Sequence, residues 1–299
     1  MTKLTIFTPT YNRAYMLGKL FASLKNQTNF DFVWLIIDDG STDNTEEVVK
    51  NWQKEDLPFK IGYVKKENGG KNTAIDLSNQ ICKTDYIVCI DSDDYLTNDA
   101  VEKIYKEIKL VDKNDSICGI VSRRVKPDGK PFKENWTGEE YKALNFYDLA
   151  PKYGYDADTC LVFKTNIIKR FSFPKIPTER FVTESVFYQQ FLYDYKMLAS
   201  AHLYYVAEYM PDGYTSQGMK LFFKNPKGYL YSLKQDLYYA RKNKGSLKSK
   251  LGLATSYYAW KKVNKIKDDF PNVYKLPMLY KIFGVLLSPI KIAKFKRIK

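Results

Sequence analysis

The chain has 299 residues, of which 44% are hydrophobic and 16% aromatic, a composition that excludes intrinsic disorder and fits one large domain with an appendage, or two domains. Its single histidine, His202, excludes mechanisms that need two histidines. The net charge of +14 is uneven: residues 220–299 hold 20 Lys and Arg against three acids, giving +17, which leaves −3 for residues 1–219.

The first 125 residues alternate between apolar runs typical of strands and patterns typical of helices. The expected strands are residues 4–8, 32–38, 61–64, 86–90 and 116–123, and the expected helices are one carrying Leu17 to Leu24, then residues 43–55, 73–81 and 98–110. Asp43, followed three residues later by Glu46, marks one helix start. This alternation predicts an α/β fold: a doubly wound, mostly parallel sheet with helices on both faces.

The strand Tyr86-Ile-Val-Cys-Ile ends in three carboxylates, Asp91, Asp93 and Asp94. Open α/β sheets bind ligands at the carboxyl ends of their strands, and Mg²⁺ or Mn²⁺ would relieve the repulsion within the cluster. The polar loops 8–13, 38–45 and 67–72 follow other strands of the same sheet, so all four loops are expected at one crevice. The structural alternative is a polar turn, with Asp94 capping the next helix.

Two common nucleotide signatures are absent from the sequence. No Gly-x-Gly-x-x-Gly follows the first strand, and no Gly-x-x-x-x-Gly-Lys-Ser/Thr is present, so neither a dinucleotide fingerprint nor a P-loop is expected.

The four cysteines (Cys82, Cys89, Cys118, Cys160) contain no Cys-x-x-Cys pair and predict small buried side chains in a reducing cytosol. The amino terminus enters a strand directly, so no secretory signal is expected.

Four ordered motifs carry a family resemblance: Thr8-Pro-Thr-Tyr-Asn-Arg13, Ile37-Asp-Asp-Gly-Ser-Thr-Asp43, Asn68-Gly-Gly and Asp91-Ser-Asp-Asp94. In order and spacing they resemble the family-2 glycosyltransferases, nucleotide-diphospho-sugar transferases of the GT-A fold. The likeness covers residues 3–110 and continues more weakly to about residue 220. It implies an inverting transfer from a nucleotide-sugar, normally a UDP-sugar, with Mn²⁺ or Mg²⁺ as cofactor.

The resemblance also implies a role for each matching residue. Thr8 and Tyr11 would border the nucleoside, Asp39 would hydrogen-bond the base, Lys71 would contact phosphate, Asp91 would lie near the ribose or donor sugar, and Asp93 would be the main metal ligand. The family places its general base in a Glu-Asp pair, which here becomes Glu184-Ser185. Glu184 is therefore the expected base, with Asp158 and Asp156 as alternatives, and Asp158 is the candidate for a sugar hydroxyl contact.

The chain is expected to divide into a glycosyltransferase domain, residues 1–219, and a basic, aromatic-rich helical extension, residues 220–299. Within the first, residues 1–125 form the nucleotide-binding half and 126–219 the acceptor half. Residues 278–289 are apolar apart from Tyr280, Lys281 and Ser288. They precede a basic run (Lys291, Lys294, Lys296, Arg297 and Lys299), a pattern typical of a segment bound to an anionic membrane surface. A solvated basic tail on a packed helix is the alternative, and nucleic acid is not an expected partner.

The predicted function is therefore metal-dependent, inverting sugar transfer to a hydroxyl of a carbohydrate or lipid-linked carbohydrate in surface polysaccharide or glycolipid synthesis. The absence of a Gln-x-x-Arg-Trp motif favours a single addition per binding event. The expected location is cytoplasmic, peripheral on the inner face of the plasma membrane. A nucleotidyltransferase and a catalytically inactive membrane-docked binding module are the alternatives.

Overall fold

The computed structural model describes residues 2–207, 217–268, 270 and 274–298, so Lys299 of the predicted basic tail lies outside it. The chain divides into two compact units. The first comprises Met1–Ser172 and Gln190–Met210, and the second comprises Phe173–Gln189 and Pro211–Lys299. The domain boundary expected between residues 219 and 220 stays a prediction. In the division into compact units, residues 173–189 group with the carboxyl-terminal helices.

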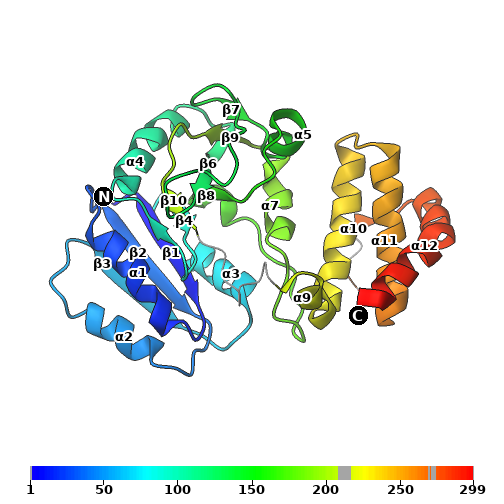
Figure 1. Ribbon diagram of the computed structural model, residues 1–299, viewed down its shortest axis with the longest axis horizontal. Coiled ribbons are helices and arrows are strands. Elements are labelled where there is room, and N and C mark those ends of the chain that lie inside the picture. Colours follow the sequence, from blue (N-terminus) through cyan, green and yellow to red (C-terminus); the bar gives the residue numbers. More distant parts are fainter. Residues whose placement is uncertain (1, 208–216, 269, 271–273, 299) are drawn as a thin grey trace. The chain divides into compact units, whose positions relative to one another are not determined.

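The first unit is built on one ten-stranded sheet (Figure 1). Its strands are β1 (Leu4–Thr10), β2 (Phe32–Asp38), β3 (Lys60–Lys65), β4 (Tyr86–Cys89), β5 (Tyr95–Leu96), β6 (Ile117–Val125), β7 (Ala143–Leu144), β8 (Thr159–Lys164), β9 (Lys196–Ala199) and β10 (Tyr205–Val206). The main path runs β3-β2-β1-β4-β8-β6-β10-β5, and β9 pairs with both β6 and β7.

The amino-terminal part of the sheet is the predicted parallel one. β1 pairs in parallel with β2 and β4, and β2 pairs in parallel with β3. β4 and β6 are not neighbours, because β8 lies between them and is antiparallel to both. The α/β fold with a mostly parallel core sheet is confirmed, and a strand from much later in the chain completes it.

Helices cover both faces of this sheet, because successive side chains of a strand point to opposite sides. Leu4 and Ile6 of β1 join a buried cluster with α1 (Ala14–Lys25) and α4 (Ala100–Val111). The alternate residue Thr5 instead approaches Cys82, at the end of α3 (Lys71–Ile81), with 3.4 Å between Sγ and Oγ1. All four cysteines are free thiols, three of them buried and Cys89 half-buried.

Short elements complete the first unit: α2 (Thr45–Trp52), the 3₁₀ turn η1 (Phe146–Asp148), α5 (Leu149–Tyr153) and α6 (Thr165–Ile168). The helix expected from residue 43 begins at Thr45 and ends at Trp52. Asp43 marks its start, because Asp43 Oδ1 accepts hydrogen bonds from the Thr45 backbone N–H (3.1 Å) and hydroxyl (2.5 Å). Glu46 does not complete a capping box. Its carboxylate pairs with Lys50 and Lys65.

The second unit is helical: α9 (Met219–Lys224), α10 (Pro226–Lys242), α11 (Leu247–Asn264) and α12 (Met278–Ile298), with α10–α12 side by side (Figure 1). The segment before and within α7 (Ser185–Leu192) joins it, because Gln235 Nε2 donates to the Val186 carbonyl (2.9 Å) and Gln189 Nε2 to Asp236 (2.6 Å). Trp260 is wholly buried at its core. Among the described residues, no helix combines the length and apolar character needed to cross a bilayer.

Candidate active site

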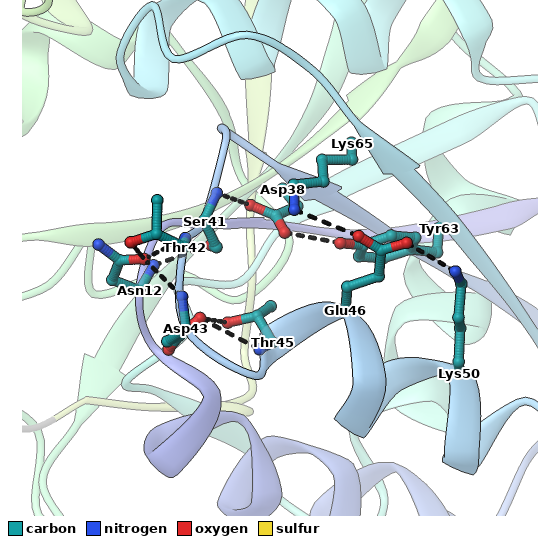
Figure 2. Close-up of polar contacts among 10 residues, drawn as sticks. All are labelled: Asn12, Asp38, Ser41, Thr42, Asp43, Thr45, Glu46, Lys50, Tyr63 and Lys65. Atoms are coloured by element: carbon teal, nitrogen blue, oxygen red, sulfur yellow. Dashed lines mark hydrogen bonds and ion pairs between the residues drawn. The ribbon is translucent and has the colours of Figure 1, made fainter.

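The loops that follow β1 and β2 are tied together by side chains (Figure 2). Asn12 has a left-handed φ of 52°, and its Oδ1 accepts hydrogen bonds from the Thr42 N–H (2.8 Å) and the Asp43 N–H (3.3 Å). Wholly buried Asp38 accepts from the Ser41 N–H (2.7 Å) and the Tyr63 hydroxyl (2.6 Å). Neither Asn12 nor Asp38 was predicted as a site residue, and both hold this edge of the sheet in shape.

Asp39 lies in a small pocket of hydrogen-bond donors. Its carboxylate accepts from the Gly69 N–H (3.0 Å), the Gly70 N–H (2.7 Å) and Lys66 Nζ (2.6 Å). Gly40 makes this approach possible, because it has a φ of +84° and an added Cβ would lie 3.0 Å from the Asn68 nitrogen. The structure therefore joins the loop after β2 to the Asn68-Gly-Gly motif, and Lys66 is a partner that the sequence reasoning missed.

The three carboxylates after β4 each meet a different cation. Asp91 Oδ1 lies 2.6 Å from Lys71 Nζ at the start of α3. Asp93 Oδ2 lies 3.8 Å from Arg13 Nη1, and Asp94 Oδ2 lies 3.7 Å from Arg124 Nη1. Lys71 and Asp91, from two of the loops expected at one crevice, are thus in direct contact, and three loops and a strand converge here.

Arg124 of β6 and Tyr205 of β10 contact the acidic turn, residues 91–94, and hold it in place. The Tyr205 hydroxyl donates to Asp94 Oδ2 (2.6 Å) and accepts from the Asp91 N–H (3.1 Å), and the Arg124 guanidinium lies over the Tyr205 ring at 4.2 Å. Both residues are distant in sequence from the motifs, and no local signal could have identified them. Asp94 therefore belongs to this network, and the next helix is preceded by Asp99 instead.

The electrostatics differ from one carboxylate to the next. Burial works against ionisation of Asp91, but the charges of Lys71 and Arg124 hold its pKa below the usual value. Burial and the charge of Asp91 raise the pKa of Asp93, and the same two causes raise the pKa of Asp94 to about 7. Asp93 is thus a half-buried carboxylate with weak cationic compensation, at 3.8 Å from Arg13.

A divalent metal at this site would need oxygen ligands from the acidic turn. Among the described residues, no group of three or more His, Cys, Asp and Glu side chains is arranged to hold a metal ion. Mg²⁺ and Mn²⁺ bind through one or two carboxylates plus substrate phosphates and water, so a complete protein cage is not required. The incompletely compensated carboxylate of Asp93 fits such a single-ligand role.

The remaining predicted residues make other contacts, and, against the effect of burial, the charge of Asp158 acts together with those of Asp91 and Asp94 to raise the pKa of Arg124. The Thr8 hydroxyl is buried and accepts from Trp34 Nε1 (3.0 Å), whereas Tyr11 is exposed directly after β1. Asp158 precedes β8, and its carbonyl accepts from the Tyr155 hydroxyl (2.9 Å). Asp156 is in an exposed ion pair with Lys133 (2.5 Å). Their expected roles stay predictions.

Glu184 belongs to the second unit. It directly precedes α7, and its carbonyl accepts from the Phe187 N–H (2.9 Å) and the Tyr188 N–H (3.1 Å). Its carboxylate accepts a hydrogen bond from the Tyr188 hydroxyl (2.8 Å). Ser185, which stands where the family carries an Asp, has its hydroxyl 3.3 Å from that of Thr183. The assignment of Glu184 as the base is a prediction.

Comparison with known proteins gives a family match over more than half of the chain. The model of glycosyl transferase family 2 matches residues 5–176. The chain is 36% identical over 137 residues to a chondroitin synthase of Pasteurella multocida, a region covering 46% of this chain and 14% of that protein. It is 32% identical over 111 residues to a GalNAc(5)-diNAcBac-PP-undecaprenol β-1,3-glucosyltransferase of Campylobacter jejuni, covering 36% and 35%. The chain thus matches about a third or less of these relatives' lengths.

Solved structures share the fold at low sequence identity. S. aureus TarS 1–349 in complex with UDP aligns with a TM-score of 0.59 at 15% identity, covering 97% of this chain and 82% of that one. A mannosyltransferase from Pyrobaculum calidifontis, in complex with GDP-Man and Mn²⁺, aligns with a TM-score of 0.52 at 16% identity, covering 97% and 87%. These similarities support the fold alone.

Proposed function

The chain belongs to glycosyl transferase family 2, and from that premise we propose that it transfers a sugar from a nucleotide-sugar to a hydroxyl group of a carbohydrate or lipid-linked carbohydrate. The observation that carries the proposal is the cluster of Asp91, Asp93 and Asp94 after β4, met by Lys71 and Arg13 from neighbouring loops. Such a cluster at the carboxyl edge of a parallel sheet suits a diphosphate with its metal.

The donor is proposed to be a UDP-sugar, bound across the edge formed by the loops after β1, β2 and β4. Asp39 would accept from the base, near Thr8 and Tyr11, and its present donors, Gly69, Gly70 and Lys66, fix its orientation. Lys71 would contact phosphate, and Asp91 would approach the ribose or sugar. The bound ligand of TarS, UDP, favours this nucleotide, although the mannosyltransferase was solved with GDP-Man.

Asp93 is the residue proposed to hold Mn²⁺ or Mg²⁺. When bound, the metal would stabilise the negative charge that develops on the departing nucleoside diphosphate. Asp94 and Asp91 would hold the turn in place through Tyr205, because its hydroxyl contacts both residues. The weak pairing of Asp93 with Arg13, at 3.8 Å, leaves Asp93 available as an oxygen ligand.

Inversion requires one direct displacement, in which a carboxylate takes the proton from the attacking hydroxyl. Glu184 is our candidate, and Asp158 would contact a sugar hydroxyl. The acceptor is proposed to be an intermediate in surface polysaccharide or glycolipid synthesis, because the Campylobacter relative is named for an undecaprenol-linked substrate. We propose a cytoplasmic location, peripheral on an anionic membrane, for the same reason.

The test is release of nucleoside diphosphate from a panel of UDP-sugars and GDP-sugars, with Mn²⁺, with Mg²⁺ and with a chelator. A UDP-sugar should turn over only with metal. Glu184→Gln should lower turnover by about 10²–10⁴ while leaving UDP affinity unchanged. Glu139→Gln, which alters an exposed ion pair with Lys142, is the matched control and should act like wild type.

Other outcomes have distinct meanings. Equal loss in Asp158→Asn with none in Glu184→Gln would move the base to Asp158. Turnover of no sugar nucleotide, in a protein that still binds UDP, would favour the inactive binding module. Pyrophosphate release from a nucleoside triphosphate would instead favour a nucleotidyltransferase.

A further inference from the structure

Helix α12 contacts the rest of its unit through two small residues, Gly284 and Ser288, and through Phe295 closer to its end. At Gly284 an added Cβ would lie 2.5 Å from Tyr258 Cδ2 and 3.0 Å from the Ala254 carbonyl oxygen, so only glycine allows this approach to α11. Ser288, one turn later, is buried, and Phe295 packs its ring edge on Trp260 with centroids 5.1 Å apart. Between residues 278 and 290, the small residues Gly284 and Ser288 therefore face inward, and the larger apolar residues lie on the other side.

The outward side of α12 is a continuous apolar face. We define the α12 face as Leu279, Ile282, Phe283, Leu286 and Ile290, which recur at helical spacing and are all exposed. Leu286 is 66% exposed and Ile290 is 73% exposed. Isolated exposed apolar residues are common, but a run over three turns of one helix marks an interaction surface.

The helix backbone is intact through this face despite Pro289. Proline has no N–H, so the Val285 carbonyl loses the partner it would have four residues later. The Ser288 hydroxyl donates to that carbonyl instead, at 2.8 Å. The α12 face is therefore presented by one continuous helix, Met278–Ile298.

The charges next to the α12 face are of one sign. Helix α12 contains five basic residues (Lys281, Lys291, Lys294, Lys296, Arg297) and no acid, and four of the five lie after the α12 face. The chain from residue 220 onward carries +17. An occupant of the α12 face must therefore be apolar where it meets this face and anionic beside it.

This charge pattern discriminates between the candidate occupants. A second copy of the chain carries the same charge of +17 from residue 220 onward, so pairing two copies would bring like charges close and repel. The α12 face also spans about 12 residues, a strip about 18 Å long and about 10 Å wide, well below the roughly 800 Å² per partner of a stable interface. An anionic lipid surface supplies both an apolar layer and negative head groups.

We propose that the α12 face docks the protein on an anionic lipid bilayer, with the helix lying along the interface and its last two turns among the phosphates. The inference deepens the proposed membrane partner by naming the surface. It also assigns membrane contact to the α12 face rather than to the apolar residues of the basic tail, because Ile292 and Phe295 pack inward with the core of the second unit. Its test uses no donor or acceptor, so its failure would leave the proposed sugar transfer untouched.

The experiment is co-sedimentation of the full chain with vesicles of phosphatidylcholine alone and of phosphatidylcholine with phosphatidylglycerol in equal amounts. Wild type should bind the mixed vesicles and not the neutral ones, and binding should weaken with salt. The double variant Leu286→Ser/Ile290→Ser should bind at least about tenfold more weakly. Lys294→Gln and Lys296→Gln should each weaken binding about fivefold.

The matched control is Leu247→Ser, because Leu247 is a 60% exposed apolar residue of the same unit at the start of α11. It should bind as wild type does, and all variants should unfold at the same temperature because the changed side chains are exposed. Unchanged binding of the double variant, or no binding of wild type, would overturn the proposal. A dimer that the double variant dissociates, without vesicle binding, would assign the α12 face to a second copy.

Discussion

Glu107 of α4 makes the stability of the first unit depend on pH. Its side chain is 0% exposed, and its Oε1 accepts a hydrogen bond from Ser200 Oγ (2.5 Å), directly after β9. Burial raises the pKa of Glu107 to about 7 from its ordinary value of 4.5. The carboxyl is therefore protonated in the folded protein at pH 5–6, whereas in the unfolded chain it is already ionised.

The sign of the effect follows from proton binding. Between pH 4.5 and about 7 the folded state holds a proton that the unfolded state has released, so stability falls as pH rises and levels off above the folded pKa. A shift of about 2.5 units at 1.36 kcal/mol each gives a loss of about 3 kcal/mol from this group. Glu107→Gln is always neutral and keeps the oxygen that accepts from Ser200, so it should remove this loss.

The assay is urea unfolding of wild type and Glu107→Gln at pH 5 and pH 8. We expect similar free energies of unfolding at pH 5, and at pH 8 an advantage of about 3 kcal/mol for Glu107→Gln. Glu102→Gln is the control on the same helix, because Glu102 pairs with Lys106 on the surface, which lowers its pKa, so it stays ionised across this range. The reasoning is refuted if Glu107→Gln and wild type lose stability in parallel between the two pH values.

Three further substitutions test the scaffold of the site. Tyr205→Phe removes the donor to Asp94 and should lower the free energy of unfolding, measured with urea, by about 1.5–3 kcal/mol. An unchanged free energy would show that the Tyr205 hydroxyl does not stabilise the fold. Asp39→Asn removes the negative charge facing Lys66 and should lower both the free energy of unfolding, by about 1–3 kcal/mol, and the affinity for UDP. If both values were unchanged, the placement of Asp39 in the nucleotide site would be contradicted. Gly40→Ala forces a side chain into a left-handed φ of +84° against the next loop and should cost about 1–2 kcal/mol of unfolding free energy.

Much of the fold could be predicted because its signals are local. The apolar run Phe32–Asp38 and the abrupt change to acids after residue 90 are properties of neighbouring residues, and parallel strands bring their carboxyl ends to one edge. That reasoning placed the loops of Lys71 and Asp91 at one crevice, and in the structure these two side chains form an ion pair at 2.6 Å.

The rest depends on contacts between distant parts of the chain. Arg124 and Tyr205 reach the acidic turn only because β6 and β10 pair in the sheet. Tyr205 lies 111 positions after Asp94, so the sequence around Asp94 gives no indication of this contact. β8 inserts between β4 and β6 for the same reason. In α12 the sequence shows apolar and basic residues, but the burial of Gly284 and Phe295 decides which side faces outward.

The central claim is a nucleoside diphosphate site formed with metal at Asp93. It is tested most directly by calorimetric titration of UDP and GDP, each with Mn²⁺ and with a chelator, into wild type, Asp93→Ala and the exposed-loop control Asp56→Asn. We predict UDP binding that needs both Mn²⁺ and Asp93, is stronger than GDP binding and is unchanged in Asp56→Asn. UDP affinity that is equal in Asp93→Ala or with chelator, or no binding of either nucleotide to wild type, would contradict the claim.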